Sequence, residues 1–254
     1  MSHTPTDRDR PGAIRINKFF TEHGLASRRG ADRLIEEGRV TINGRQAVLG
    51  DVVSPDDRVT LDGRPVTWGH ARVYIKYHKP IGITTTTESA VEGNIIAAIN
   101  HPDRIFPVGR LDKDSSGLIF LTNDGDLVNQ ILRAEFGHER EYRVEVDRPI
   151  TEAFLGRMST GVLVLGRPTL PCKVWGVGRR RFQIVLTEGR NRQIRRMCET
   201  LGYHVVALQR TRIMHVTLDG LPVGTWADLS ESEREQLLRA VGRSSTGKSL
   251  EIRP

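Results

Sequence analysis

Short strand patterns and short helix patterns alternate along most of this chain, without the regular strand–helix–strand spacing that builds a parallel sheet. In the longer, C-terminal region the strand patterns lie at 117–122, 141–146, 161–165, 182–186 and 205–208. The helix patterns there lie at 94–99, 126–133, 151–158, 191–201 and 231–241. This order predicts an α+β fold in which flanking helices cover a mixed, largely antiparallel sheet. Ser230 and Glu233 predict a capping box at the start of the last helix.

A smaller unit precedes this region, at residues 14–66. Two short helices are expected there, at 16–23 and 28–37, because a glycine follows each and Ser27 suits the N-cap of the second. The pair Asn43-Gly44 favours a tight hairpin turn between short strands. The unit is therefore predicted to consist of two helices and a small sheet.

The remaining segments are polar. Residues 1–13 and 242–254 are expected to be disordered tails, because they contain few apolar residues. Residues 67–72 are the expected linker. The predicted domains are accordingly 14–66 and 73–241.

The charge of the chain suggests a polyanionic partner. Lys and Arg number 38 against 31 Asp and Glu, which gives a net charge of +7. In the small unit the basic residues gather on or beside the two helices: Lys18, Arg28, Arg29 and Arg33. From the residues alone, this group is equally a solvated helix face or a phosphate-binding surface.

Several classes of chemistry lose their usual sequence support. The chain has no G-x-x-x-x-G-K-[ST] or G-x-G-x-x-G loop, no H-E-x-x-H zinc motif and no G-x-S-x-G elbow. The only two cysteines, Cys172 and Cys198, cannot form a disulfide framework. No apolar run is long enough to span a bilayer, and the N-terminus lacks an apolar signal region. We therefore expect a cytoplasmic protein with no membrane partner, no metal and no cofactor, whose chemistry would use side chains alone.

Two polar segments stand out from their surroundings. In G-R-L-D-K-D-S-S-G-L (109–118), Asp112 lies between Arg110 and Lys113 and an apolar strand follows. An ordinary surface turn would explain this segment on composition alone. In L-T-E-G-R-N-R-Q-I-R-R-M (186–197), arginines lie at a predicted helix start, where the helix dipole opposes them. That placement suggests an acidic partner, either phosphates or a carboxylate.

The small unit resembles a known RNA-binding module. The segment R-I-N-K-F-F-x-x-x-G-L-A-S-R-R-x-A-D-x-L-I-x-x-G-R-V-x-I-N-G is similar to the S4 domain. The resemblance implies a helix–turn–helix with a small sheet. It also implies that structured RNA binds to the face that carries Lys18, Arg28, Arg29 and Arg33.

The C-terminal region resembles an enzyme family. The segments G-R-L-D-x-x-S-S-G-L, E-Y-R-V and L-T-E-G-R-N-R-Q-I-R-R-M, with K-P-x-G at 79–82, are similar to motifs of rRNA pseudouridine synthases. Within the group of these enzymes that carry an S4 domain, the chain most resembles the F branch of the large-subunit rRNA synthases. The resemblance implies the pseudouridine synthase fold. It implies cofactor-free isomerisation of uridine in structured RNA, with large-subunit rRNA favoured and small-subunit rRNA or tRNA also possible.

The resemblance also implies roles for individual residues. Asp112 would be the catalytic carboxylate, acting either as nucleophile at C1′ or as base at C2′, and Arg195 would pair with it. Tyr142 would pack on the uracil and is a candidate for the proton step at C5. Arg110 would occupy the base stack after the target nucleotide leaves it. The remaining candidate RNA contacts are Lys79, Arg190, Asn191 and Arg192.

Two other functions remain compatible with the sequence. A non-catalytic S4-type RNA-binding or ribosome-assembly factor would need no carboxylate at position 112. A glycosidase that works with side chains alone would need a second carboxylate, for which Asp114 is the nearby candidate. For any of these functions we expect a monomer.

Overall fold

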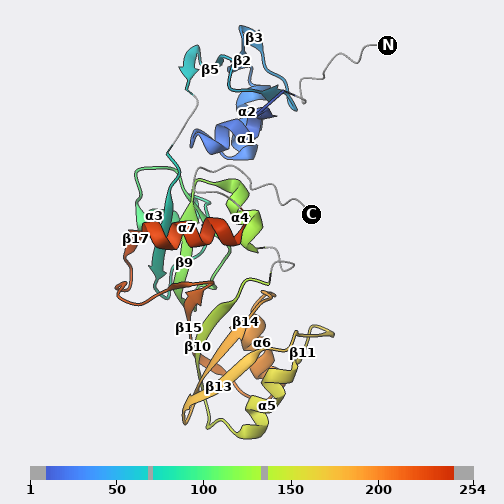
Figure 1. Cartoon of the computed structure of the whole chain (residues 1–254), viewed down its shortest axis with the longest axis vertical. Coiled ribbons are helices and arrows are strands. Elements are labelled where there is room, and N and C mark those ends of the chain that lie inside the picture. Colours follow the sequence, from blue (N-terminus) through green and yellow to red (C-terminus); the bar gives the residue numbers. More distant parts are fainter. Residues whose placement is uncertain (1–9, 68–70, 133–136, 243–254) are drawn as a thin grey trace. The chain divides into compact units, whose positions relative to one another are not determined.

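The computed structural model describes residues 10–67, 71–132 and 137–242 (Figure 1). The chain divides into two compact units, and each is described by itself. The first contains the residues up to Val73, together with the loop segments Pro102–Ile105 and Asn123–Gly125, and the second contains the rest. Residues 1–9 and 243–254 of the predicted tails (1–13 and 242–254), and residues 68–70 of the predicted linker (67–72), lie outside the described residues.

The first unit is two helices on short strands. Its elements are β1 (Ile14–Arg15), α1 (Ile16–Glu22), α2 (Arg28–Glu36), β2 (Val40–Ile42), β3 (Arg45–Gln46), β4 (Val52–Val53), β5 (Val59–Leu61) and β6 (Arg64–Val66). Ser27 caps α2 as predicted, since its Oγ accepts a hydrogen bond from Gly30 N at 3.0 Å. Asn43 (φ 50°) and Gly44 (φ 84°) make the predicted hairpin turn between β2 and β3. The core is apolar and includes the fully buried rings of Phe19 and Phe20.

Part of the segment predicted as a tail at 1–13 is ordered. Residues 10–13 form a turn, in which Ala13 N donates to Arg10 O at 3.1 Å. The Arg10 guanidinium donates to the carboxylate of Asp57 at 3.0 Å. This ion pair joins the segment to the small unit, and its partner lies 47 residues away, which a composition argument cannot detect.

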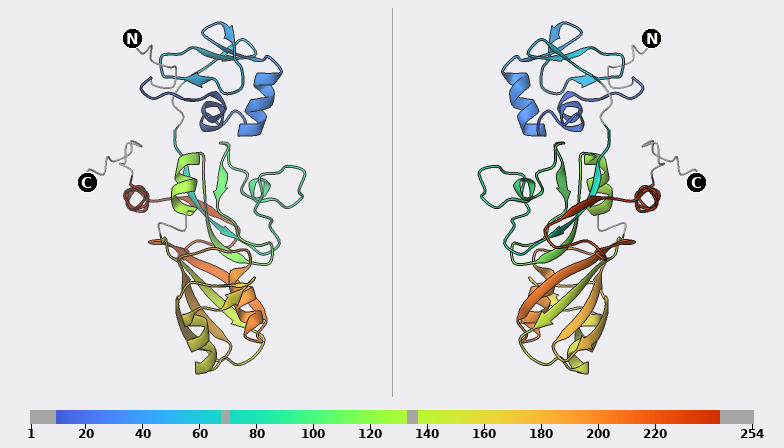
Figure 2. Two further views of the ribbon diagram at one scale, coloured as in Figure 1. Left: turned by 90° about the vertical axis from the view of Figure 1, so that its right-hand side faces the viewer. Right: turned by 90° about the vertical axis from the view of Figure 1, so that its left-hand side faces the viewer.

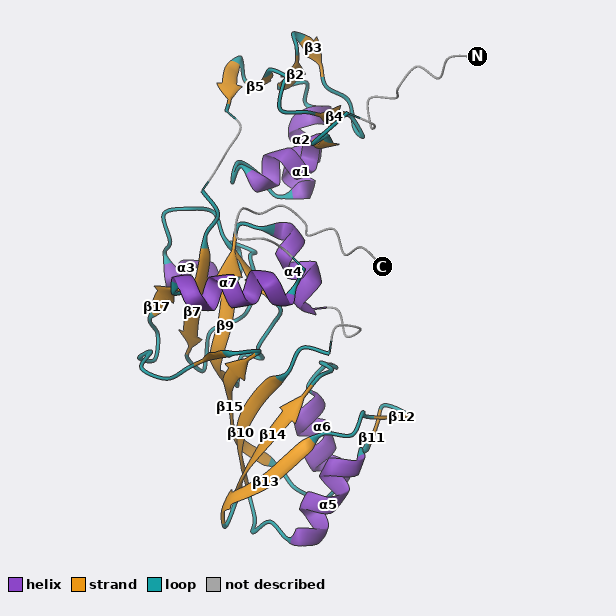
Figure 3. Cartoon of the chain, in the orientation of Figure 1, coloured by secondary structure: helices purple, strands orange, loops and turns teal. Residues whose placement is uncertain are grey.

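The second unit is built on a nine-stranded sheet (Figures 2 and 3). Its strands are β7 (Tyr74–Lys79), β8 (Phe106–Val108), β9 (Ser116–Thr122), β10 (Arg140–Val146), β13 (Lys173–Gly178), β14 (Arg181–Leu186), β15 (Val205–Ile213), β16 (Val216–Thr217) and β17 (Trp226–Asp228). The main strand order is β13-β14-β10-β15-β9-β7-β17. Each pairing is antiparallel except that of β15 with β9. The α+β prediction with a mixed, largely antiparallel sheet is confirmed.

Helices and one hairpin complete this unit. They are α3 (Ile95–Ile99), α4 (Gly125–Leu132), α5 (Glu152–Thr160), the hairpin of β11 (Leu163–Val164) and β12 (Arg167–Pro168), α6 (Gln193–Thr200) and α7 (Glu231–Ala240). The capping box of Ser230 and Glu233 starts α7 as predicted. One apolar cluster packs α5 and α6 on β10 and β14, and another packs α4 and α7 on β7 and β9. No helix of the described segments is long and apolar enough to cross a membrane.

Two element predictions near the cleft described below were incomplete. The strand expected at 205–208 runs on to Ile213, and β13 was not expected at all. In β15, the polar residues from Gln209 to Arg212 interrupt the apolar pattern of a strand. In β13, two glycines lower the strand propensity. Hydrogen bonding to β10 stabilises β15, and hydrogen bonding to β14 stabilises β13. A pattern of neighbouring residues cannot predict these pairings.

Candidate active site

The segments 109–118, 141–144 and 186–197, which carry the resemblance to pseudouridine synthases, meet at one cleft of about 540 Å³. The loop 109–115 before β9 (the Asp112 loop) forms one wall, and the segment from residue 188 to the start of α6 forms another. Residues of β10 and β15 form the floor. Of the predicted site residues, those that line this cleft are Arg110, Asp112, Tyr142, Arg190, Asn191 and Arg192.

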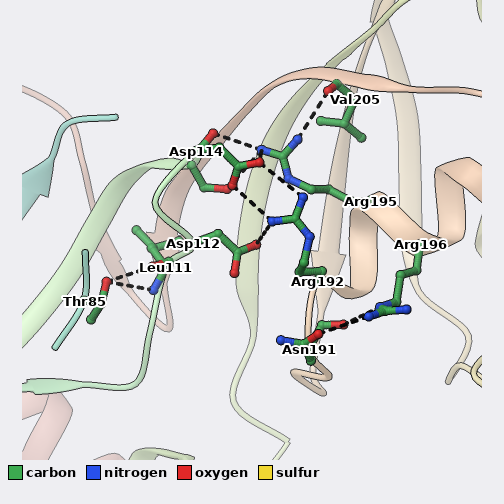
Figure 4. A network of polar contacts seen from close by, with 10 residues as sticks. Thr85, Leu111, Asp112, Asp114, Asn191, Arg192, Arg195, Arg196 and Val205 are labelled. Atoms are coloured by element: carbon green, nitrogen blue, oxygen red, sulfur yellow. Dashed lines mark hydrogen bonds and ion pairs between the residues drawn. The ribbon is translucent and has the colours of Figure 1, made fainter. Parts of the chain in front are cut away.

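The backbone of the Asp112 loop is held by a buried threonine. Thr85 Oγ1 donates to Leu111 O at 2.8 Å and accepts from Leu111 N at 3.3 Å (Figure 4). Ser115 N donates to Asp112 O at 3.1 Å, which closes the turn. Leu111 is buried, whereas the Asp112 side chain is 33% exposed. The loop therefore presents one carboxylate to the cleft from a fixed backbone.

The arginine that contacts Asp112 is not the predicted one. Arg195 lies with its Nη2 3.2 Å from Asp114 Oδ2, and it also donates to Asp114 O at 2.9 Å. Arg192 Nη1 lies 3.5 Å from Asp112 Oδ2, while its Nη2 lies 3.2 Å from Asp114 Oδ2. Figure 4 shows Arg192 between the two carboxylates. The expected Asp112–Arg195 pair is thus replaced by a network in which Asp114 joins both arginines.

Local backbone geometry explains this exchange. Arg192 is the N-cap of α6 with a left-handed φ of 51°, so its side chain leaves the helix and stays 40% exposed. Arg195 lies on the buried side of the helix and is tied to Val205 O at 3.2 Å. Burial acts to raise the pKa of Asp114, but the hydrogen bond from Arg192 and the charge of Arg195 outweigh it. The pKa of Asp114 is therefore held below its ordinary value.

Lys79, which was predicted to contact RNA, is buried and bonded within the protein. Its side chain is 0% exposed, and its ammonium donates to Pro80 O and Ile83 O, each at 2.8 Å. Burial lowers the pKa of Lys79 to about 8, although the charges of Asp112 and Asp114 oppose that shift. Gly82 N in the same segment donates to Lys113 O at 2.8 Å. Lys79 thus stabilises the segment that supports the Asp112 loop.

The other predicted contacts differ in their availability. Arg190 is already bound by the protein, since its guanidinium donates to Glu188 Oε2 at 3.0 Å and to Pro168 O at 2.6 Å. Asn191 is exposed and accepts hydrogen bonds from Arg196. Arg110 is exposed, and no hydrogen bond or ion pair engages its side chain among the residues that the structure describes.

Two arginines of the floor were missed by the sequence reasoning. Arg140 and Arg210 are only 8% and 4% exposed, and both line the cleft beside Tyr142. Arg140 begins the segment that carries Tyr142, whereas Arg210 lies in the unexpected extension of β15. Tyr142 marked the first segment as a candidate, whereas the polar residues from Gln209 to Arg212 hid the strand that carries Arg210.

The first unit carries the predicted basic helical face. Arg28, Arg29 and Arg33 are exposed on α2, and in the described part of the chain no carboxylate lies within ion-pair distance of them. Lys18 on α1 lies 3.6 Å from Glu22. Groups of three or more side chains that could hold a metal ion are not found among the described residues.

Comparison with known proteins gives consistent results for both units. Residues 73–164 match the family of RNA pseudouridylate synthases, and residues 14–59 match the S4 domain. The chain is 50% identical over 244 residues to the dual-specificity RNA pseudouridine synthase RluF of Escherichia coli K12, covering 95% of this chain and 83% of that protein. It is 32% identical to the ribosomal large subunit pseudouridine synthase B of Bacillus subtilis, covering 88% and 95%. A crystal structure of a pseudouridylate synthase is similar with a TM-score of 0.65 at 30% identity, covering 88% and 99%.

Proposed function

The chain belongs to the RNA pseudouridine synthases that carry an S4 domain, and from that premise we propose that it converts a specific uridine of large-subunit rRNA into pseudouridine. The similarity to a large-subunit synthase and to a dual-specificity synthase supports this substrate class. The second of these relatives also supports a further RNA substrate, for which tRNA is the candidate. The proposed domains remain an S4 unit at 14–66 and a catalytic domain at 73–241.

One observation supports this function above the others. The Asp112 carboxylate opens into a cleft that also contains Tyr142 and Arg192. We propose that Asp112 acts on the ribose of the target nucleotide, either as nucleophile at C1′ or as base at C2′, and both roles need an ionised carboxylate. Tyr142 would pack on the uracil. Arg195 would act through Asp114, which holds it and Arg192 in place.

The surroundings of the Asp112 loop suit a nucleotide that has left its stack. A second cleft of about 570 Å³ adjoins the loop, and Arg110, Asp112 and Arg192 line both clefts. Extruding a base costs a few kcal/mol, which new contacts must offset. The exposed Arg110 side chain is the proposed group that enters the space left by the base. The basic helical face of the S4 unit would bind RNA phosphates elsewhere on the substrate.

A comparison of RNA from cells with and without the gene tests the proposal. Carbodiimide-based mapping of pseudouridine in total RNA should show one large-subunit rRNA site that disappears with the gene. The site should return with the wild-type gene but not with Asp112→Asn. The chain is a non-catalytic RNA-binding factor if deletion of the gene removes no pseudouridine and if the wild-type and the Asp112→Asn genes both restore ribosome assembly. If free uracil is released, it is a glycosidase.

We further propose that the enzyme acts as a monomer in the cytoplasm. The segments 109–118, 141–144 and 186–197 lie in one chain and come together at this cleft, which supports a site formed within a single copy. Light scattering of the purified protein measures the mass directly. A stable dimer would overturn this part of the proposal and leave the substrate assignment unaffected.

A further inference from the structure

The floor of the cleft brings two arginines and a tyrosine to one face of the sheet. Strand register places Arg210 on β15 opposite Tyr142 on β10. Arg140 lies two residues before Tyr142 on the same strand, and therefore on the same face. All three line the cleft that Asp112 also lines.

These two arginines are buried without a compensating negative charge. Across the described residues, no carboxylate lies within ion-pair distance of Arg140 or Arg210. Their protein partners are backbone carbonyls. Arg140 donates to Ile131 O at 3.2 Å, and Arg210 donates to Leu118 O at 2.7 Å and to Arg110 O at 3.5 Å. Burial of an unpaired charge is costly, so such groups normally have a partner.

The Nη2 atom of Arg210 is the strongest indication that a ligand binds at this floor. It is buried and has no hydrogen-bond partner in the protein, although its residue lines the cleft. Burial and the nearby charge of Arg210 lower the pKa of Arg140, against an opposing effect of Tyr142. The two cations are thus close enough to repel each other. Both observations point to a ligand that brings negative charge or carbonyl oxygens to this floor.

The burial of the two arginines indicates which part of the RNA binds to them. Backbone phosphates follow the protein surface, where exposed cations such as Arg110 meet them. A flipped base is the part of a nucleotide that enters an enclosed pocket. The arginines lie at 4% and 8% exposure beside the tyrosine proposed to pack on uracil. Their position therefore fits the base and not the phosphate.

We propose that Arg140 and Arg210 hold the uracil through its carbonyl oxygens and stabilise the negative charge that the base carries while it is detached from the ribose. This inference rests on the proposed function. When the N1–C1′ bond breaks, its electron pair stays on the uracil and spreads from N1 to O2 and O4. The base then turns, and C5 forms the new bond to C1′. The proton lost from C5 and the proton gained by N1 balance, so the product is an isomer.

Fixed donors at the place where charge develops lower the barrier, because they need no reorganisation during the step. The guanidinium groups serve this purpose better than a single ammonium, because each offers several donors in one plane. Their carbonyl bonds to β9 and to the end of α4 fix their orientation. The same residues therefore bind the base and position it near Asp112.

Single-turnover rates with two substrates test the proposal. The substrates are an rRNA fragment that contains the mapped uridine and the same fragment with 5-fluorouridine at that position. Because C5 of 5-fluorouridine carries fluorine and has no proton to lose, the rate compared is that of N1–C1′ bond breakage, followed as disappearance of the starting nucleoside after digestion of the RNA. Fluorine withdraws electrons, so the detached base needs less stabilisation. On uridine RNA, Arg140→Met and Arg210→Met should each slow the reaction about 100-fold, as expected for a lost charge-stabilising donor, with RNA affinity nearly unchanged. On 5-fluorouridine RNA the loss should be several-fold smaller.

The control is Arg143→Met, which removes an exposed arginine from the opposite face of the same strand. It should react like the wild type on both substrates. Thermal unfolding is measured for each variant to check that it folds. If Arg210→Met does not fold, the rates of Arg140→Met and Arg140→Lys on the two substrates test the inference instead. An equal loss on both substrates, a loss only in RNA affinity, or no loss overturns the inference. A wild-type enzyme that leaves uridine unchanged overturns the proposed function instead.

Discussion

The side chain of Arg195 is bound to Asp114 at two points, through Asp114 Oδ2 at 3.2 Å and through Asp114 O at 2.9 Å. Arg192 forms ion pairs with both Asp114 and Asp112. Asp114 is therefore the residue through which the helix α6 holds the Asp112 loop. We propose that Asp114 positions the two arginines, whereas Asp112 reacts with the ribose of the target nucleotide.

The substitution Asp114→Asn should reduce activity through this network. Loss of one charge leaves Arg195 with backbone partners and lets Arg192 move onto Asp112. A displacement of this kind costs up to about 100-fold in rate. We expect the single-turnover rate constant to fall at least about 10-fold, with RNA affinity nearly unchanged. Asp228→Asn, at an exposed position of β17, is the matched control. Wild-type rates for both variants would show that the network is not needed.

Arg195→Met should lose most activity for the same reason, since Arg195 is the buried anchor of the network. Because the variant keeps Asp114 and Arg192, the remaining pair can partly hold the loop. The rate measured for Asp114→Asn in the Arg195→Met background separates the contributions. If the two losses are fully additive, Arg195 and Asp114 act independently and the positioning role is wrong.

Asp112→Asn should abolish pseudouridine formation. The amide keeps the shape of the carboxylate but supplies neither a nucleophile nor a base, so a loss of at least about 1000-fold is expected. RNA affinity should change little, because the cations that line the clefts remain. Pseudouridine released by nuclease digestion measures the first quantity, and filter binding measures the second. Appreciable isomerisation by this variant would remove Asp112 from the mechanism.

Lys79 should give the stability of the protein a distinctive pH dependence. Burial lowers its pKa from 10.5 to about 8, so between these values the unfolded chain holds a proton that the folded protein has lost. Stability therefore rises with pH across this window, by at most about 1.4 kcal/mol per pH unit for one proton. Urea denaturation at several pH values should show this slope, and Lys79→Met should flatten it. Lys173→Met, at an exposed lysine, should leave it unchanged.

Gly117 should not tolerate a side chain. Its φ is +116°, and a Cβ atom there would overlap the backbone N and O of Arg210, where β9 pairs with β15. Gly117→Ala is therefore expected to destabilise the fold by several kcal/mol and to displace the floor of the cleft. Gly156→Ala, inside α5 with open space around it, should instead stabilise the fold by about 0.5–1 kcal/mol. Equal unfolding temperatures for the two variants would contradict the close approach.

The basic helical face should govern the salt dependence of RNA binding. Replacing Arg28, Arg29 and Arg33 by Gln removes three exposed cations, each worth roughly 0.7–0.9 in the slope of log Kd against log salt. The slope should therefore fall by roughly 2–3. Arg45→Gln is the control, because Arg45 is already paired with Asp51 at 2.9 Å. An unchanged slope in the triple variant would make the S4 unit a structural appendage.

The sequence by itself determined the elements whose signals are local. Ser27 and Ser230 cap helices through a backbone N–H three residues away, and Asn43-Gly44 closes a turn between neighbouring strands. The predicted helices therefore end within a few residues of those observed. The motif resemblance added the family and the identity of the segments that line the cleft.

Only the tertiary structure decided which of these residues meet. Arg195 pairs with Asp114 and not Asp112 because helix orientation and the Val205 carbonyl direct its side chain. Lys79 turned out to be buried, and Arg210 reached the floor through the register of β15 against β10. Caps and turns depend on neighbours in the chain, which a pattern records. Ion-pair partners, burial and strand register depend on residues far apart in the sequence, which are brought together only when the sheet has formed.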